Sequence, residues 1–287
     1  MTLVSIIIPY FNSGATIEKT IASAKTQSWS PLEIIVINDG STDAKSCSIL
    51  RKLKGVKVIN QENAGLPSAR NTGFKHANGE YVLPLDADDW IETDAIEQLM
   101  KPLRENSQIC FSFSPIILEN EASGILMKPY NYFEQLFFNQ LPYSLLLPKH
   151  VWQQIGGYNT EMKDGYEDWE FNVRLGRLGF FGEAIPKPVF HYKVSQSGML
   201  LSKASKLHFT LWADIQARNL DVYSFRSLMS NWRKWRQHQS TYPLFVYFLW
   251  LFMSRIFPEN IMVKLFTFML NFSHSRRVTA ATQKKAI

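Results

Sequence analysis

The stretch Ile34-Ile35-Val36-Ile37-Asn38-Asp39-Gly40-Ser41-Thr42-Asp43 decides the fold of this chain. Its first four residues are all β-branched and apolar, which is typical of a strand buried on both faces in a parallel sheet. The polar residues that follow form a turn, and Asp43 is placed to cap a helix that extends to about Leu53. A buried strand, a turn and a helix in this order predict one βα repeat of a parallel sheet.

The same alternation of buried strands and helices continues on both sides of this stretch. Further strands are predicted at Leu3–Ile8, Val56–Ile59 and Tyr81–Leu85, and further helices at Ala15–Ala24, after the N-cap candidates Asn12 and Ser13, and at Pro67–Ala77. The sequence therefore predicts an α/β fold, a mostly parallel sheet flanked by helices. In such sheets the ligand binds beyond the carboxyl ends of the strands, where polar residues cluster here after the first, second and fourth strands.

The middle third of the chain is less regular. Strands are expected within Ile109–Leu118, Phe180–Ala184 and Val189–Val194, and helices at Tyr130–Asn139, Pro148–Ile155 and Gly165–Leu178. From about Ser202 the composition becomes basic, aromatic and helical. We therefore place a domain boundary there, between residues 1–202 and a helical extension, 203–287.

Composition excludes several classes of protein. The chain has 287 residues, of which 46% are hydrophobic and 14% aromatic, so it is not a disordered protein. Only Cys47 and Cys110 are present, which excludes a disulfide scaffold and favours a reducing compartment. No Lys or Arg precedes the first apolar run, and Pro9 ends it early. We therefore expect no secretory signal peptide and a cytoplasmic location.

Three carboxylates follow the predicted strand Tyr81–Leu85: Asp86, Asp88 and Asp89. On an extended segment, residues two apart point the same way, so Asp86 and Asp88 can share one site. Two close carboxylates repel each other unless a cation lies between them, and Mg²⁺ or Mn²⁺ prefers oxygen ligands. The alternative is a solvated acidic loop with an Asp cap on a helix from Thr93.

Two other carboxylates are candidates for a site. Asp39 lies at a strand end, where it can accept hydrogen bonds from a nucleobase or a ribose, or only stabilise a turn. Asp168 lies in the first turn of the helix predicted over Gly165–Leu178. It is a candidate general base, although acidic residues are favourable there for the helix dipole alone. Glu170 and Arg174 are spaced for an ion pair on the same helix.

Five ordered blocks of the sequence resemble family 2 glycosyltransferases. They span about residues 3–199 and include the acidic pairs of the family's DxD and ED motifs. The blocks are Val4–Asn12, Ile34–Asp43, Asn63–Gly73, Asp86–Asp88 and Glu167–Asp168. The resemblance implies that residues 1–202 form a catalytic domain of the GT-A fold. It would have a Rossmann-like nucleotide-binding half of about 1–105 and an acceptor-binding half of about 106–202.

The resemblance also assigns roles to single residues. Those implied to bind the nucleotide are Pro9, Phe11, Asp39, Arg70 and Asp86. Asp88, together with Asp86, is implied to hold a divalent cation, Mg²⁺ or Mn²⁺. Asp168 is implied to deprotonate the acceptor hydroxyl in a single displacement that inverts the anomeric carbon.

One block departs from the family pattern. Many relatives carry Tyr-Arg-x-His near the end of the catalytic domain, but here Lys193 stands at the Arg position and Ser195 at the His position. This difference makes a protein metal ligand beyond the DxD motif doubtful. Lys193 is a candidate contact for the diphosphate, whereas His191 is expected to pack structurally.

The C-terminal extension carries all of the positive charge excess. The net charge of +6 divides into −4 for residues 1–202 and +10 for residues 203–287. Basic residues alternate with Trp over Phe225–Gln239, and the apolar runs Leu244–Met253 and Ile261–Phe272 follow. Neither run reaches the ~20 residues that span a bilayer. Three alternatives remain: the helices of 225–272 pack on the catalytic domain, lie on the inner face of the cell membrane, or form a homodimer. No RNA-binding motif accompanies them, so nucleic acid is not expected.

The function expected from these features is transfer of a sugar, hexosyl or N-acetylhexosaminyl, from a nucleotide-diphosphate donor, UDP-linked, to a glycan or glycolipid acceptor. The setting would be synthesis of a cell-surface polysaccharide or lipopolysaccharide. A nucleotidyltransferase would need a Gly-rich phosphate loop, which Pro9–Gly14 does not offer. A non-catalytic nucleotide-sugar-binding scaffold remains the other alternative, disfavoured by the retained Asp residues.

Overall fold

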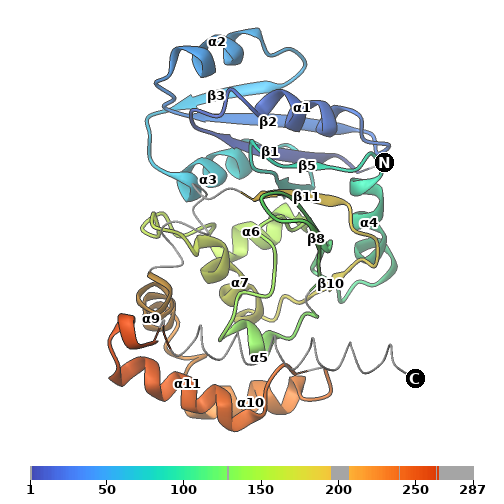
Figure 1. The fold of residues 1–287 in the computed structure, drawn as a ribbon. Helices are drawn as coiled ribbons and strands as arrows, with labels where there is room; N and C mark the ends of the chain where they lie inside the picture. The colour runs from blue at the N-terminus through green and yellow to red at the C-terminus, as the bar shows by residue number, and fades with distance from the viewer. Residues whose placement is uncertain (1, 128, 195–206, 239, 263, 265–287) are drawn as a thin grey trace, which may run out of the picture.

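A computed structural model describes residues 2–127, 129–194, 207–238, 240–262 and 264. A mostly parallel central sheet lies between helices, and more helices follow toward the C-terminus (Figure 1). The strand order is β3-β2-β1-β4-β9. The strands of this sheet are β1 (Val4–Tyr10), β2 (Leu32–Asp39), β3 (Lys57–Gln61), β4 (Tyr81–Pro84) and β9 (Leu147–Pro148). Only β9 runs antiparallel to its neighbour. The predicted fold class is confirmed.

Successive side chains of a strand point to opposite faces of a sheet, and both faces of β1 and β2 are apolar. Helices therefore pack on each face of this sheet. Ile6, Ile8 and Val36 pack on one face, and Ile7 and Ile37 pack on the other. The first face is covered by α1 (Ile17–Lys25), α2 (Ala44–Lys52) and α4 (Ala95–Glu105). The second is covered by α3 (Leu66–His76), α6 (Lys149–Ile155) and α7 (Glu167–Arg177).

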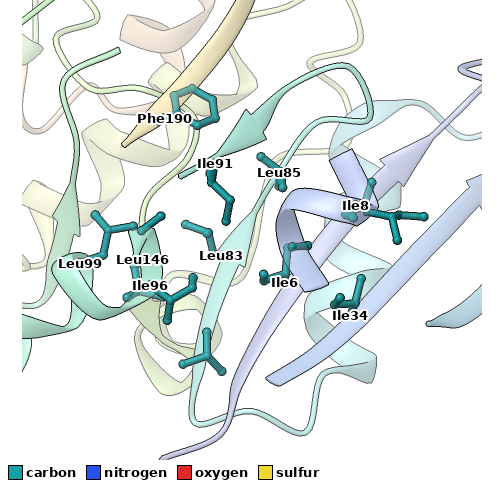
Figure 2. Close-up of a cluster of buried hydrophobic side chains, with 14 of the residues drawn as sticks. Ile6, Ile8, Ile34, Leu83, Leu85, Ile91, Ile96, Leu99, Leu146 and Phe190 are labelled. Carbon is teal, nitrogen blue, oxygen red and sulfur yellow. The ribbon is translucent and has the colours of Figure 1, made fainter. Parts of the chain in front are cut away.

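The core on the first face joins the sheet to segments far away in the chain. Figure 2 shows Leu83 near Ile96 of α4 and Leu85 near Ile91, in a cluster that also contains Leu99 and Phe190. The buried run that ends β4 therefore fixes the start of the acidic loop that follows it.

Two smaller sheets lie beyond β4. One has the order β5-β11-β7-β8 and consists of β5 (Trp90–Ile91), β7 (Ile116–Asn120), β8 (Gly124–Leu126) and β11 (Phe190–Val194). The other pairs β6 (Phe111–Phe113) with β10 (Gly182–Ala184). β5, β8 and β9 were not predicted, because strands of two or three residues are defined by their partners and have no pattern of their own. The antiparallel pair of β5 with β11 fixes the acidic loop between β4 and β5.

The C-terminal helices share a hydrophobic core with the middle of the chain. They are α9 (His208–Arg218), α10 (Phe225–Trp235) and α11 (Leu244–Ile256), and they pack with α7 and the short helix α5 (Tyr132–Gln135). This core joins Phe137 and Trp169 to Trp212, Tyr247 and Trp250. One face of these helices is therefore packed on α5 and α7 of the preceding region, which is the first of the three alternatives. None of the helices in the described ranges combines the length and apolar character needed to cross a bilayer.

The predicted role of Asn12 as a helix cap is wrong. The helix begins at Ile17 with Thr16 at its N-cap, and Asn12 has a left-handed backbone with φ of 50°. Its Oδ1 accepts hydrogen bonds from the backbone N–H groups of Thr42 and Asp43. Asn12 thus ties the loop after β1 to the loop after β2. The predicted cap by Asp43 is confirmed, since its carboxylate accepts the Ser46 N–H at 2.8 Å.

Candidate active site

A cleft of about 560 Å³ opens at the carboxyl ends of β1, β2 and β4. Parallel strands end at the same edge of the sheet, so the loops that follow them meet there. The cleft brings together five residues singled out from the sequence: Pro9, Phe11, Asp39, Asp86 and Asp88. Phe11 is 47% exposed and thus presents an apolar ring to any ligand in the cleft.

Asp39 shapes one wall of this cleft. Its side chain is almost fully buried, and it accepts hydrogen bonds from the backbone N–H groups of Ala64 and Gly65, each at 2.9 Å, and from Gln61 at 2.7 Å. Asn63 also donates to its backbone carbonyl at 3.0 Å. The Asp39 side chain therefore stabilises the loop at 61–65, whereas within its own turn the Ser41 N–H bonds to Asn38. Oδ2 of Asp39 accepts a single one of its hydrogen bonds, which leaves it lone-pair capacity toward a ligand.

Arg70 lies behind the cleft and joins its two acidic motifs. It is 1% exposed, and its guanidinium binds Asp86 at 2.9 Å and Glu167 at 2.7 Å. The rings of Tyr143 and Tyr158 lie 4.8 and 5.5 Å from the guanidinium carbon. The two carboxylates raise the pKa of Arg70 well above its usual value, against the opposing effect of burial. Arg70 therefore holds carboxylates in place, and its charge is already paired within the protein.

Asp89 and Tyr143 form a second connection beneath the acidic loop. The Tyr143 hydroxyl donates to Asp89 at 2.5 Å and accepts the Asp86 N–H at 2.8 Å. The backbone N–H of Lys193 also donates to Asp89, at 2.9 Å. Asp89 is 1% exposed, and burial raises its pKa well above its usual value. The alternative of a solvated acidic loop is therefore wrong, because Asp89 is buried. The expected Asp cap is not formed either, since α4 begins at Ala95 and the side chain of Asp94 makes no capping hydrogen bond.

Asp88 and Asp86 fit the donor set of a hard divalent cation. Asp88 lines the cleft, and burial, together with the nearby charge of Asp86, raises the pKa of Asp88. A cation between the two would favour their ionised forms. In the described part of the chain no group of three or more His, Cys, Asp or Glu residues is placed to hold a metal. Mg²⁺ commonly binds through one or two carboxylates plus substrate phosphates, so the pair is compatible with such a site. Ser195, at the family's His position, lies outside the described residues.

Asp168 lies at the start of α7, next to Glu167, which is the ion-pair partner of Arg70. Asn139 donates to its Oδ2 at 2.9 Å, and the Trp169 N–H donates to its Oδ1 at 2.8 Å. Burial raises the pKa of Asp168, while the charge of Arg70 opposes this rise. A half-buried carboxylate with a raised pKa and fixed orientation has the properties of a general base. The predicted pair of Glu170 with Arg174 is confirmed, at 2.7 Å.

Lys193 and His191 lie on β11 with different surroundings. The backbone N–H of Lys193 bonds to Asp89 of the acidic loop, and the positive charge of Lys193 acts to lower the pKa of Asp88. His191 lies between Glu119 at 2.6 Å and Glu92 at 2.8 Å, and its ring stacks on Trp90. These contacts agree with the structural role expected for His191.

Sequence reasoning missed Lys163, Tyr143 and Asn139. Lys163 lines the cleft. It lies five positions before Asp168, so a basic residue shortly before the acidic pair was a signal available in the sequence. Tyr143 and Asn139 lie in an irregular segment without periodicity, and their contacts depend entirely on tertiary packing.

The parallel sheet, the cleft at its strand ends and the two linked acidic motifs define a glycosyltransferase of the GT-A fold. A family model described as Glycosyl transferase family 2 matches residues 5–167, which is more than half of the chain. The chain belongs to this family.

Similar proteins support this assignment. Glycosyltransferase GlyA of Streptococcus pneumoniae is 42% identical over 105 residues, which are 36% of this chain and 15% of that protein. Chondroitin synthase of Pasteurella multocida is 28% identical over 190 residues, 62% of this chain and 19% of the synthase. The chain thus spans a minor share of the length of both relatives.

Solved structures share the fold. S. aureus TarS 1-349 in complex with UDP aligns with a TM-score of 0.59 at 20% identity, covering 75% of this chain and 65% of that one. GalNAc-T7 with UDP, GalNAc and Mn²⁺ aligns with a TM-score of 0.57 at 16% identity, covering 76% and 48%. At these identities the likeness shows the GT-A fold.

Proposed function

We propose that this protein is an inverting glycosyltransferase that moves a hexosyl or N-acetylhexosaminyl group from a UDP-sugar to an acceptor hydroxyl. The acceptor would be a glycan or glycolipid in the synthesis of a cell-surface polysaccharide. The observation that carries this proposal is the joint position of Phe11, Asp39, Asp86 and Asp88 in one cleft, linked through Arg70 and Glu167 to Asp168. The UDP complexes of TarS and GalNAc-T7, and the name of chondroitin synthase, support the donor and the setting.

The wall formed by Pro9, Phe11 and Asp39 would bind the nucleoside. The exposed ring of Phe11 offers a stacking surface for a base, and the free capacity of Asp39 Oδ2 can accept a base N–H. Lys163, on the same cleft, and Lys193, beside the acidic loop, would supply positive charge to the diphosphate.

Asp86 and Asp88 would hold Mg²⁺ or Mn²⁺ together with the diphosphate. When bound, such an ion stabilises the negative charge that builds on the leaving diphosphate. The protein keeps the Asp86 carboxylate in place through its ion pair with Arg70 and through the Tyr143 bond to the Asp86 backbone.

Asp168 would accept the proton of the acceptor hydroxyl while the hydroxyl oxygen bonds to the anomeric carbon. The bond from that carbon to the diphosphate oxygen breaks in the same displacement, which inverts the configuration. Asn139 orients the Asp168 carboxylate, and burial makes it a stronger base than an exposed Asp.

The experiment is calorimetric titration of UDP with Mn²⁺ or with EDTA, followed by a screen of UDP-sugars for release of UDP. We expect binding that depends on Mn²⁺ and turnover of at least one donor. In Asp168→Asn, kcat should fall by about 10²–10⁴-fold while the Kd of UDP changes by less than roughly twofold.

The matched control is Glu161→Gln, which changes an exposed carboxylate that pairs with Arg218 away from the cleft. It should retain full turnover. Equal loss of binding and turnover in Asp168→Asn would contradict its role as a base, and UDP binding without turnover of any donor would favour the non-catalytic scaffold.

A further inference from the structure

Helix α11 has an apolar face that the hydrophobic core does not use. Tyr247, Trp250 and Leu251 point into the core shared with α5 and α9 and are nearly fully buried. The outer face carries four large apolar residues with exposed fractions between 51% and 68%: Phe245, Leu249, Phe252 and Ile256. Their spacing of four, three and four residues places them in one stripe along the helix. A contiguous stripe of this kind marks an interaction surface.

The surroundings of this stripe are basic. The sequence from Val222 to Pro258 contains no Asp or Glu. Five cationic side chains in that segment are exposed: Arg226, Arg233, Lys234, Arg236 and Arg255. Phe225, at the start of α10, is 72% exposed, and its ring lies 5.6 Å from that of Phe248 of α11 in a tilted contact, so the apolar surface continues from one helix to the next. We call the stripe, Phe225 and these five cations the basic apolar face.

We propose that the basic apolar face docks this protein on an anionic lipid bilayer, with α11 lying in the plane of the interface. Apolar side chains flanked by Lys and Arg suit the boundary between acyl chains and anionic headgroups. The thirteen residues of α11 are too few to span a bilayer, which needs ~20. A second copy of this chain fits less well, because pairing two such faces would bring like charges together.

Docking in this way is compatible with an open cleft. Figure 1 shows α10 and α11 at the end of the molecule opposite β2 and β3, and Asp39 at the end of β2 lines the cleft. The bilayer would therefore contact the end of the molecule away from that sheet. The proposal depends on the surface of the C-terminal helices and is independent of the chemistry at Asp168.

The test is sedimentation of the full chain with vesicles of phosphatidylcholine alone or of phosphatidylcholine mixed with phosphatidylglycerol. We expect binding to the mixed vesicles that weakens with added salt. In Phe245→Ser/Phe252→Ser the partition coefficient should fall by about tenfold or more, because two exposed apolar side chains no longer insert. In Arg226→Glu/Arg255→Glu it should fall by about fivefold or more for each charge changed.

Matched controls are Ile125→Ser, an exposed apolar residue on β8, and Arg51→Glu/Lys52→Glu on α2. Both should bind like the unaltered chain, and UDP affinity and circular dichroism should show that all variants are folded. The proposal is overturned if the unaltered chain does not bind anionic vesicles or if the face variants bind as the controls do. A dimer by sedimentation velocity that dissociates in Phe245→Ser/Phe252→Ser, without vesicle binding, would assign the face to a second copy.

Discussion

At the scale of single residues, Arg70 is the connection between donor site and base. Its charge is paired with Asp86 and Glu167, both within 3 Å, at 1% exposure. Removing one partner of a buried ion pair leaves uncompensated charge and costs about 3–5 kcal/mol. We therefore expect Arg70→Met to lower the melting temperature and turnover strongly. Arg70→Lys should recover little, because a single ammonium cannot bind both carboxylates as the planar guanidinium does.

Thermal unfolding and steady-state kinetics check this prediction. Arg51→Met, an exposed change on α2, serves as the control and should leave both unchanged. Arg70→Met/Glu167→Gln should be more stable than Arg70→Met alone, since one unpaired carboxylate is removed. Strictly additive losses in this cycle would contradict direct coupling of the two residues.

The protonation of Asp168 sets the second prediction at this scale. A general base works when ionised, so activity falls as pH drops through its pKa. Burial raises the pKa of Asp168, so we expect the acid limb of kcat/KM above the ordinary Asp value of about 3.9. The hydrogen bond from Asn139 lowers the pKa of Asp168. Asn139→Ala removes this bond, so the pKa should rise and the acid limb should shift to higher pH. The pH profile of Asn106→Ala, far from the cleft, is the control; an unshifted limb in Asn139→Ala would contradict the assignment.

At the scale of elements, the contact of α3 with β1 has no space for a larger side chain. A Cβ added at Gly73 would lie 2.1 Å from Cγ2 of Ile7. Gly73→Ala would push α3 away from the sheet, and overpacking of this kind typically costs about 1–3 kcal/mol. Because Gly65 and Leu66 at the start of α3 line the cleft, the affinity for UDP should fall as well.

Chemical denaturation and UDP titration measure both effects. The control Lys75→Ala lies exposed on the same helix and should change neither. Ile7→Ala alone creates a cavity, but combined with Gly73→Ala it makes room for the new methyl group, so the double variant should lose less stability than the sum of the two. Additive losses would show that the clash is not what destabilises Gly73→Ala.

Element patterns also explain what the sequence could and could not predict. The apolar runs of β1 and β2 are buried on both faces, so their composition alone identifies them as strands. Asp39 and Asp86 could then be predicted as cleft residues, because each lies at the end of a strand. The burial of Arg70 was not predictable, because its partners lie 16 and 97 positions away. Asn12 was misassigned for the same reason: a residue suited to a helix cap instead binds a loop 30 positions away.

At the scale of the whole molecule, the C-terminal helices complete the hydrophobic core around α5 and α7. Glu134 of α5 is fully buried and accepts hydrogen bonds from Ser240, Thr241 and Tyr247, which belong to the segment around α11. Trp212 of α9 donates to the Leu136 carbonyl at 2.9 Å. The boundary proposed near residue 202 therefore separates an acidic from a basic part of the sequence. The hydrophobic core nevertheless contains residues from both sides of it.

This continuity predicts a single unfolding transition for the whole chain. Because α5 and α7 share one core with α9 and α11, the C-terminal helices cannot unfold without exposing Phe137 and Trp169. We expect one calorimetric peak, shifted upward as a whole by UDP with Mn²⁺, since a ligand stabilises the cooperative unit that binds it. Trp212→Ala should lower the free energy of unfolding by about 3–5 kcal/mol and move the same peak to lower temperature. Leu220→Ala, at an exposed position, should leave the peak where it is. Two peaks, with only one responding to UDP, would instead make the C-terminal helices a unit that folds by itself.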